Sequence, residues 1–527
     1  MTALSFRRRL AACAVLLGLA LPMLAGAQPL ATPRKQPDTD RYIVRFEADA
    51  PERRDAAARD RALAAMGRDS GVAFEHVRRL AIGADLVRAN RKLDEAAATR
   101  LALRLAANPR VEFAEPDRLL QPTLTPNDTY YANYLWHYHE PVGGIGLPSA
   151  WDLSTGSGAV VAVLDTGSTA HEDLAGNLVP GFDFISDPAI AVDGTGRDAD
   201  PSDPGDWNSA GECGGAAARS SSWHGTHVAG TVAAIGNNNT GVVGVAFGAQ
   251  VQPVRVLGKC GGSTSDIAEA ILWAGGATVA GVPANPSPSE VINLSLGAAG
   301  PCSAALQAAI DDAVGRGTVV VAAAGNEAVD AANSNPANCS NVITVGATDR
   351  TGTRAAYSNW GAVVDVKAPG GGPGNDGVWS TINSGTQAPT PFTSYAPKQG
   401  TSMATPHVAG IAALMQSRHA NTPALVETIL KATARPLPGV CFPACNAKLV
   451  DATRAVAAAT GPTIFIRDVE VTEGNAGSLL VYFTVNLSQP VASTVTFTLA
   501  TATAVPLAVA RVKVTVDATG CERLTVK

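Results

Sequence analysis

Five short apolar runs, each followed by a stretch of helical composition, dominate the middle of the chain. The runs are AVVAVLD, VQPVRVL, VINLSLG, TVVVAAAGN and VITVGATD. Strands that are apolar throughout are typical of a parallel sheet covered on both faces, because a strand with one wet face alternates with polar residues. Segments such as SAALQAAIDDAVGRG and ALVETILKAT supply the covering helices. We therefore predict an α/β domain over residues 125–458, a parallel sheet with helices on both faces.

The segments on either side of this domain have different patterns of predicted strands and helices. Residues 41–121 contain a strand, a helix, two strands, a helix and a strand, the βαββαβ order of a ferredoxin-like α+β module. Pro122 and Pro126 break that pattern, so we place a domain boundary there. Beyond residue 461 the helical segments stop, and residues 461–527 alternate as short strands. We predict a partial β module in this tail.

The first 27 residues have the make-up of a secretory signal. Three arginines precede the apolar run AACAVLLGLALPMLAG, and an A-x-A exit ends at Ala27. A membrane anchor is the alternative, but the run is short and no comparable span follows it. We expect a signal peptide over 1–27, a linker over 28–40, and a secreted, extracellular protein without a stable membrane anchor. The formal net charge of −6 gives no sign of a nucleic-acid partner.

Export changes what the cysteines indicate. Six of the eight lie in the predicted α/β domain, and an exported domain with six cysteines is expected to hold disulfide bonds: Cys213, Cys260, Cys302, Cys339, Cys441 and Cys445. Fifteen connectivities are possible for six cysteines, and pairing in sequence order is the simplest. A metal site is the weaker alternative, because the single close pair has no second pair or histidine nearby.

Four polar residues stand where the apolar runs end or where a helix of small residues begins. VLDTG contains Asp165, SWHGTHVAG contains His224, AAAGN contains Asn326 and GTSMATPHVAG contains Ser402. A serine hydroxyl attacks a carbonyl only with a base beside it, a group that orients the base, and donors for the oxyanion. Each residue alone could be a helix cap or a turn residue. Together, in this order, they indicate nucleophilic catalysis.

These four blocks strongly resemble those of the subtilisin-like (subtilase) serine peptidases, of the secreted bacterial type. The resemblance implies that Ser402 attacks the peptide carbonyl, and that His224 takes its proton and passes it to the leaving amine. It also implies that Asp165 orients His224, and that Asn326 donates to the oxyanion together with the Ser402 backbone N–H. The implied function is a serine endopeptidase that works through an acyl-enzyme intermediate.

The resemblance extends to substrate binding. The peptide is expected to bind as an added strand, and the matching residues are Ser295, Leu296, Gly297, Gly261 and Gly262, with Ala323 and Gly325 lining the primary pocket. These segments carry no acidic residue, so we expect a broad or hydrophobic preference. His227 and His407 lie within the motifs without a catalytic role, and we interpret them as structural. We expect His171 in a surface loop.

The stretch DGTGRDADPSDPGDW is the densest group of carboxylates. Crowded carboxylates with glycines favour an oxygen-rich Ca²⁺ site, and we take Asp193, Asp198 and Asp203 as candidate ligands. Subtilases commonly bind structural calcium, which favours this interpretation. A solvated acidic loop is the alternative.

The flanking modules also carry resemblances. Residues 41–121 resemble the inhibitory propeptide of subtilases, which implies a zymogen whose own propeptide is an intramolecular inhibitor and a mature chain that starts near residues 121–126. The tail IRDVEVTEGNAG resembles the opening of a Calx-β module, although the later acidic strands of that family are missing. We expect a monomer that acts on proteins or peptides. An acid peptidase of the sedolisin type and a non-catalytic adhesion protein are the alternatives.

Overall fold

The computed structural model describes residues 38–106, 108–119, 124–438 and 446–459, and five short strands beyond residue 463. The predicted signal peptide, most of the linker, Cys441 and Cys445 lie outside the described residues. So do the predicted boundary near residue 121 and most of the tail, of which the structure gives β17 (Ile464–Ile466), β18 (Val481–Leu487), β19 (Val495–Leu499), β20 (Val512–Val516) and β21 (Glu522–Val526).

An eight-stranded sheet forms the centre of the large domain, with strand order β16-β13-β12-β10-β8-β5-β7-β6. The strands are β5 (Val160–Asp165), β6 (Phe182–Asp183), β7 (Gln250–Arg255), β8 (Val291–Leu294), β10 (Val319–Ala323), β12 (Ile343–Thr348), β13 (Val366–Pro369) and β16 (Lys448–Leu449). Every pairing within it is parallel. The predicted parallel sheet is confirmed, and its five predicted strands are five of these eight.

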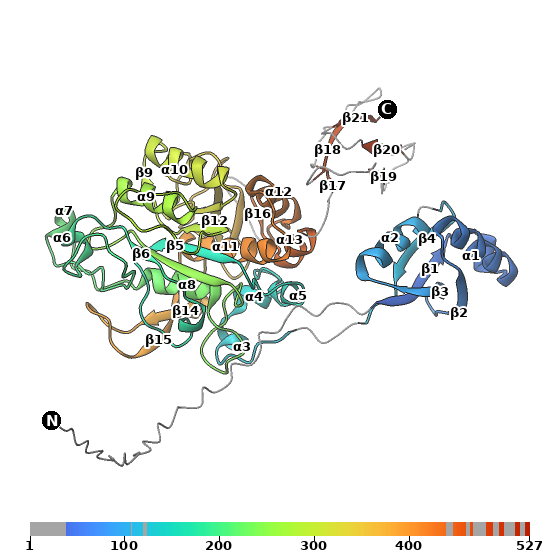
Figure 1. Ribbon diagram of the computed structural model, residues 1–527, viewed down its shortest axis with the longest axis horizontal. Coiled ribbons are helices and arrows are strands. Elements are labelled where there is room, and N and C mark those ends of the chain that lie inside the picture. The colour runs from blue at the N-terminus through green and yellow to red at the C-terminus, as the bar shows by residue number, and fades with distance from the viewer. Residues whose placement is uncertain are drawn as a thin grey trace, which may run out of the picture.

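Helices cover both faces, as predicted. Alternate residues of one strand belong to different cores: Val161 and Val163 pack with α8 (His224–Ala233) and α11 (Thr401–Arg418), whereas Ala162 and Leu164 pack with α9 (Thr264–Ala274) and α10 (Ala304–Gly315). Figure 1 shows α9 and α10 on one side of the sheet and α8 on the other. The first core also includes α5 (Leu147–Trp151), α12 (Pro423–Thr433) and α13 (Ala452–Ala458).

Small residues let α8 and α11 approach their neighbours closely. A Cβ on Gly410 would lie 2.6 Å from Cβ of Val245, and one on Gly225 would lie 2.2 Å from the carbonyl oxygen of Gly167. Larger side chains would force these helices away from the core. The predicted catalytic residues His224 and Ser402 lie in the first turns of these two helices.

The carboxyl ends of neighbouring parallel strands collect the predicted site residues at one edge. Asp165 ends β5, Ser295 follows β8, and Asn326 follows β10 after a short turn. Since β8 pairs with both β5 and β10, these three ends are adjacent. This edge is where open α/β sheets place their ligands.

The remaining elements of the large domain are short segments and one hairpin. They are α3 (Tyr131–Tyr134), α4 (Trp136–His139), α6 (Pro188–Ala191), α7 (Glu212–Gly215), β9 (Ala298–Ala299) and β11 (Ser334–Asn335). An antiparallel hairpin, β14 (Val378–Asn383) and β15 (Thr393–Lys398), leads into α11. The described residues contain no helix with the length and apolar character needed to cross a bilayer.

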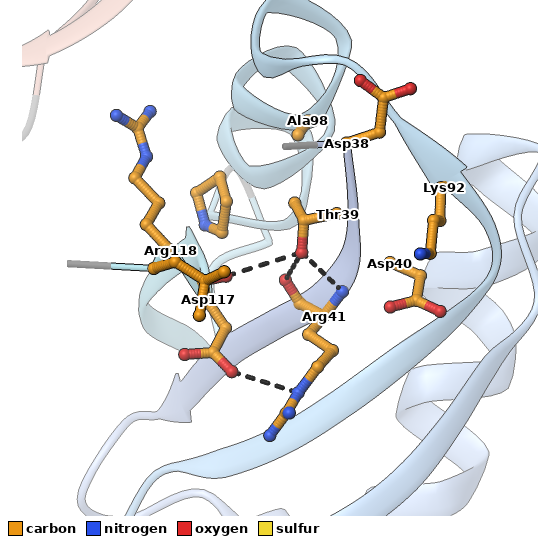
Figure 2. A pocket seen from close by; sticks show the side chains of 10 residues that line it. Asp38, Thr39, Asp40, Arg41, Lys92, Ala98, Asp117 and Arg118 are labelled. Atoms are coloured by element: carbon orange, nitrogen blue, oxygen red, sulfur yellow. Dashed lines mark hydrogen bonds and ion pairs between the residues drawn. The ribbon is translucent and has the colours of Figure 1, made fainter. Parts of the chain in front are cut away.

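The N-terminal module has the predicted βαββαβ order: β1 (Thr39–Phe46), α1 (Ala56–Ser70), β2 (Phe74–Arg79), β3 (Asp85–Leu93), α2 (Glu95–Ala106) and β4 (Val111–Pro116). Its antiparallel sheet has the order β2-β3-β1-β4, with a core of its own between sheet and helices. A hollow of about 270 Å³ lies where this module leads toward the large domain (Figure 2). There Arg41 pairs with Asp117 at 3.1 Å, which ties the start of β1 to the residue after β4.

Candidate active site

His224 and Asp165 form the best-defined contact at the sheet edge. Nδ1 of His224 lies 2.8 Å from one carboxylate oxygen of Asp165 and 2.9 Å from the other. The carboxylate can only accept, so Nδ1 carries the proton and Nε2 is left with a free lone pair. Asp165 is fully buried and also accepts from the N–H of Thr166 at 2.8 Å. The imidazole is thereby held in the orientation and tautomer of a general base.

The backbone that presents His224 is strained. Trp223, directly before it, has a positive φ of 51°, which costs a non-glycine residue about 1 kcal/mol. The indole of Trp223 is buried and donates to the carbonyl of Gly385 at 2.6 Å, which holds this conformation.

Ser402 is the second residue of α11, beside the same edge. Its hydroxyl donates to the carbonyl of Ser295 at 3.2 Å. Ser295 and His224 line a common cavity of about 480 Å³, and Ser402 contacts one of these two residues, Ser295. Helices α8 and α11 pack against each other and against β5, and the contact with Ser295 links Ser402 to a residue that lines the cavity.

Asn326 is anchored to the first residue of the same helix. Its Oδ1 accepts from the N–H of Thr401 at 2.8 Å and from the hydroxyl of Thr401 at 3.0 Å. Two donors fix which side of the amide is oxygen, so Nδ2 is the side left to donate elsewhere. Asn326 is exposed beside the N-terminus of α11, where helical N–H groups add positive potential. This arrangement suits a negatively charged oxygen.

The predicted substrate residues lie in three sets. Ser295 and Gly261 line the cavity beside His224. Gly325 donates its N–H to the hydroxyl of Thr401 at 3.2 Å, and Ala323 ends β10. The others flank these positions: Leu296 and Gly297 continue from Ser295, and Gly262 follows Gly261.

Two of the three predicted disulfides are present. Cys213 bonds to Cys260 and Cys302 bonds to Cys339, in sequence order as expected. Cys213 and Cys260 also line the cavity, so the first disulfide joins the loop after residue 206 to the predicted substrate segment. The third pair lies outside the described residues.

The structure does not gather the predicted calcium ligands of the acidic loop. Asp193 pairs with Arg255 at 2.8 Å, and Asp203 accepts from the hydroxyl of Thr166 at 2.6 Å. Asp198 is partly buried and accepts from the hydroxyl of Thr195 at 2.7 Å. Burial raises the pKa of Asp203 to about 7. Within the described ranges no group of three or more His, Cys, Asp or Glu side chains is placed to hold a metal ion. This loop does not fit the ion, because Arg255 already supplies a cation to its start.

Two other carboxylates, Asp128 and Asp173, are buried and interact with one another, and the sequence analysis did not identify them. Asp173 is fully buried and accepts from Asn238 at 2.6 Å and from the N–H of Val242 at 2.9 Å. Asp128 is also buried, and its Oδ1 has no hydrogen-bond partner among the described residues. Burial raises the pKa of Asp128 to about 6 and that of Asp173 to about 7. The run of asparagines at 237–239, beside both, was the available sequence signal.

The two motif histidines, His227 and His407, are fully buried. Nε2 of His227 lies 3.0 Å from the carbonyl of Val378, and His407 bonds to Met403 and to His137. Burial lowers the pKa of His407 to about 4. These contacts support the structural interpretation of both motif histidines.

The expectation for His171 is wrong. This residue is 3% exposed, and its Nε2 lies 2.9 Å from the carbonyl of Ser394. The β14–β15 hairpin, more than 200 positions later in the chain, covers the loop that holds it.

Comparisons with known proteins agree with this geometry. The family described as "Subtilase family" matches residues 156–461. An "Extracellular protease" of Xanthomonas campestris pv. campestris is 57% identical over 386 residues, which cover 73% of this chain and 65% of that protein. An "Extracellular basic protease" of Dichelobacter nodosus is 42% identical over 441 residues, covering 81% of this chain and 72% of that protein.

A solved structure is similar as well. A protease from Pseudoalteromonas arctica aligns with a TM-score of 0.63 and 55% identity, over 64% of this chain and all of that one. The present chain spans 65% of the length of the Xanthomonas relative.

Proposed function

Because this chain belongs to the subtilase family of serine peptidases, we propose that it is a secreted endopeptidase that cleaves proteins with Ser402 as its nucleophile. The observation that carries the proposal is the pair of short contacts, 2.8 and 2.9 Å, between His224 Nδ1 and the Asp165 carboxylate. A buried carboxylate in that position serves catalysis, because it fixes the tautomer of the base and stabilises the imidazolium that forms.

The reaction would proceed by acyl transfer. Ser402 turns from the carbonyl of Ser295 toward Nε2 of His224, gives up its proton and attacks the peptide carbonyl. Asn326 Nδ2 and the Ser402 N–H stabilise the oxyanion. His224 then protonates the leaving amine, and water activated by the same imidazole releases the acyl group.

Substrate would bind as an added strand along Ser295–Gly297 and Gly261–Gly262. Backbone hydrogen bonds of this kind tolerate many sequences, and the segments carry no carboxylate that would select lysine or arginine. We propose a broad or hydrophobic preference. The relatives' names, "Extracellular protease" and "Extracellular basic protease", support export of this chain too.

We further propose that the N-terminal module is an inhibitory propeptide. Its βαββαβ fold directly precedes the peptidase domain, and the ion pair between Arg41 and Asp117 holds the end of the module where the chain leaves it (Figure 2). Cleavage near residues 121–126 would then produce the mature enzyme.

A structural calcium ion would be held by Asp128 and Asp173 rather than by the acidic loop. Two buried carboxylates that interact with one another, one with an orphaned oxygen, form a place where a cation is favourable. The ion would balance the charge of both groups. Asp128 lies just after the proposed cleavage segment, so the ion would also anchor the start of the mature chain.

The test compares the secreted parent with Ser402→Ala. We expect the parent to hydrolyse casein, to react with a fluorophosphonate and to begin near residues 121–126 by N-terminal sequencing. Ser402→Ala should lose hydrolysis and labelling and remain unprocessed, whereas Ser417→Ala, on the same helix, should behave as the parent. Labelling that persists in Ser402→Ala would overturn the assignment.

A further inference from the structure

Pro406 leaves one carbonyl of the nucleophile helix without its usual partner. It lies inside α11, and a helical N–H at position 406 would bond the carbonyl of residue 402. Proline has no N–H, and its ring also pushes against the carbonyl four residues earlier. The peptide unit that follows Ser402 therefore needs another hydrogen-bond donor.

The side chain of Ser295 supplies this donor. Its hydroxyl donates to the carbonyl of Ser402 at 2.9 Å. The same hydroxyl oxygen accepts from Nδ2 of Asn293 at 2.9 Å, so its proton is directed away from Asn293 and toward Ser402. Asn293 lies within β8 and is fully buried, and Ser295 is 3% exposed. The central sheet thus reaches the nucleophile through two consecutive hydrogen bonds.

A second contact runs in the opposite direction, because the hydroxyl of Ser402 donates to the carbonyl of Ser295 at 3.2 Å. The two serines therefore hold each other by reciprocal side-chain to backbone bonds. The bond to the Ser402 carbonyl fixes ψ of that residue, which determines where its Cβ and hydroxyl lie relative to His224.

We infer that the Ser295 hydroxyl is a positioning residue for the nucleophile, in addition to the substrate contact expected of its backbone. The inference rests on the proposed function, since it assigns Ser295 a task only if Ser402 attacks the substrate. Replacing the side chain leaves the Ser295 carbonyl in place, so substrate binding should persist while attack slows.

The experiment measures kcat, KM and the fluorophosphonate labelling rate of Ser295→Ala and Ser295→Thr, per titrated active site. Loss of one hydrogen bond predicts a kcat and a labelling rate about five- to tenfold lower in Ser295→Ala, with KM within about twofold. Ser295→Thr keeps the hydroxyl and should recover most of the rate.

Pro406→Ala provides the decisive control, because it restores the N–H that can bond the Ser402 carbonyl. In that background Ser295→Ala should lower kcat by less than about twofold, since a helical N–H can then also bond the Ser402 carbonyl. Should Ser295→Ala fail to fold, Ser295→Cys asks the same question, because a thiol has a similar shape but donates weakly.

Equal labelling rates in parent and Ser295→Ala would overturn the inference while leaving the proposed function standing. So would a loss confined to KM, or the same fold-loss with and without Pro406→Ala. A parent that neither labels nor hydrolyses peptides would instead overturn the proposed function.

Discussion

Acid should destabilise this protein, and His407 allows the size of the effect to be worked out. The side chain is fully buried, and burial lowers its pKa from 6.5 to about 4. The unfolded chain therefore binds a proton below pH 6.5, whereas the folded chain does not until the pH falls near 4. The stabilising contribution is present above the unfolded pKa and is lost as the pH falls through this window. At about pH 5 the loss amounts to about 2 kcal/mol, and below the folded pKa it approaches about 3 kcal/mol.

The assay is denaturant unfolding followed by tryptophan fluorescence, at about pH 7.5 and about pH 5. Ser402→Ala serves as the parent, because it cannot digest itself. His407→Gln keeps a donor and an acceptor but does not titrate, so its loss of unfolding free energy between the two pH values should be about 2 kcal/mol smaller than the parent's. The quantity to compare is the change in unfolding free energy between the two pH values, because the Gln substitution itself lowers the unfolding free energy at both.

His419→Gln is the matched control, since this exposed histidine follows the end of the same helix. It should leave the acid sensitivity of the parent unchanged. His137, which bonds to His407, is also buried. Burial is the main cause that lowers the pKa of His137 and acts in every variant, whereas the smaller contribution of His407 is lost in His407→Gln. If His407→Gln loses as much stability in acid as the parent, the linkage reasoning fails.

Three further predictions concern the site and its ion. Asn326→Asp keeps the acceptor for Thr401 but removes the amide donor, so kcat should fall by about 10²- to 10³-fold with little change in KM. The size of this effect is the one known for a subtilisin. An unchanged kcat in steady-state kinetics would contradict the role of Asn326. A calcium chelator should lower Tm by about 5 °C in the parent and in Asp198→Asn, but not in Asp128→Asn, by calorimetry. Equal chelator effects in the two variants would exclude the Asp128 site. Mass spectrometry of a digested peptide library should find cleavage after apolar or varied residues, and predominant cleavage after lysine or arginine would contradict the proposed preference.

The parts of the fold that depend on local pattern could be predicted from the sequence. The strand ending at Asp165 is apolar at every position because both its faces are covered, and that property is visible in the residues themselves. The helix beginning at His224 and the one containing Ser402 are rich in small residues for a related reason, since they pack closely against the core. The family resemblance then predicted that Asp165, His224 and Ser402 act together.

Contacts between distant segments could not be predicted in this way. The crowded carboxylates of the acidic loop favoured a calcium site, but Arg255, from β7, pairs with Asp193 at the start of the loop and with Asp183 before it. His171 looked exposed because nothing nearby in sequence indicates that a hairpin covers it. Burial of this kind depends on tertiary packing, which a single sequence records only indirectly.

The two disulfides have a consequence for the lifetime of a peptidase. A peptidase in solution meets copies of itself, and a surface loop is cut only if it can extend into a neighbour's cleft. Cys213–Cys260 and Cys302–Cys339 span 47 and 37 positions, so each restrains a loop-containing stretch at both ends. A nick within either stretch would also leave the two fragments covalently joined, which allows the broken chain to keep its shape and continue working.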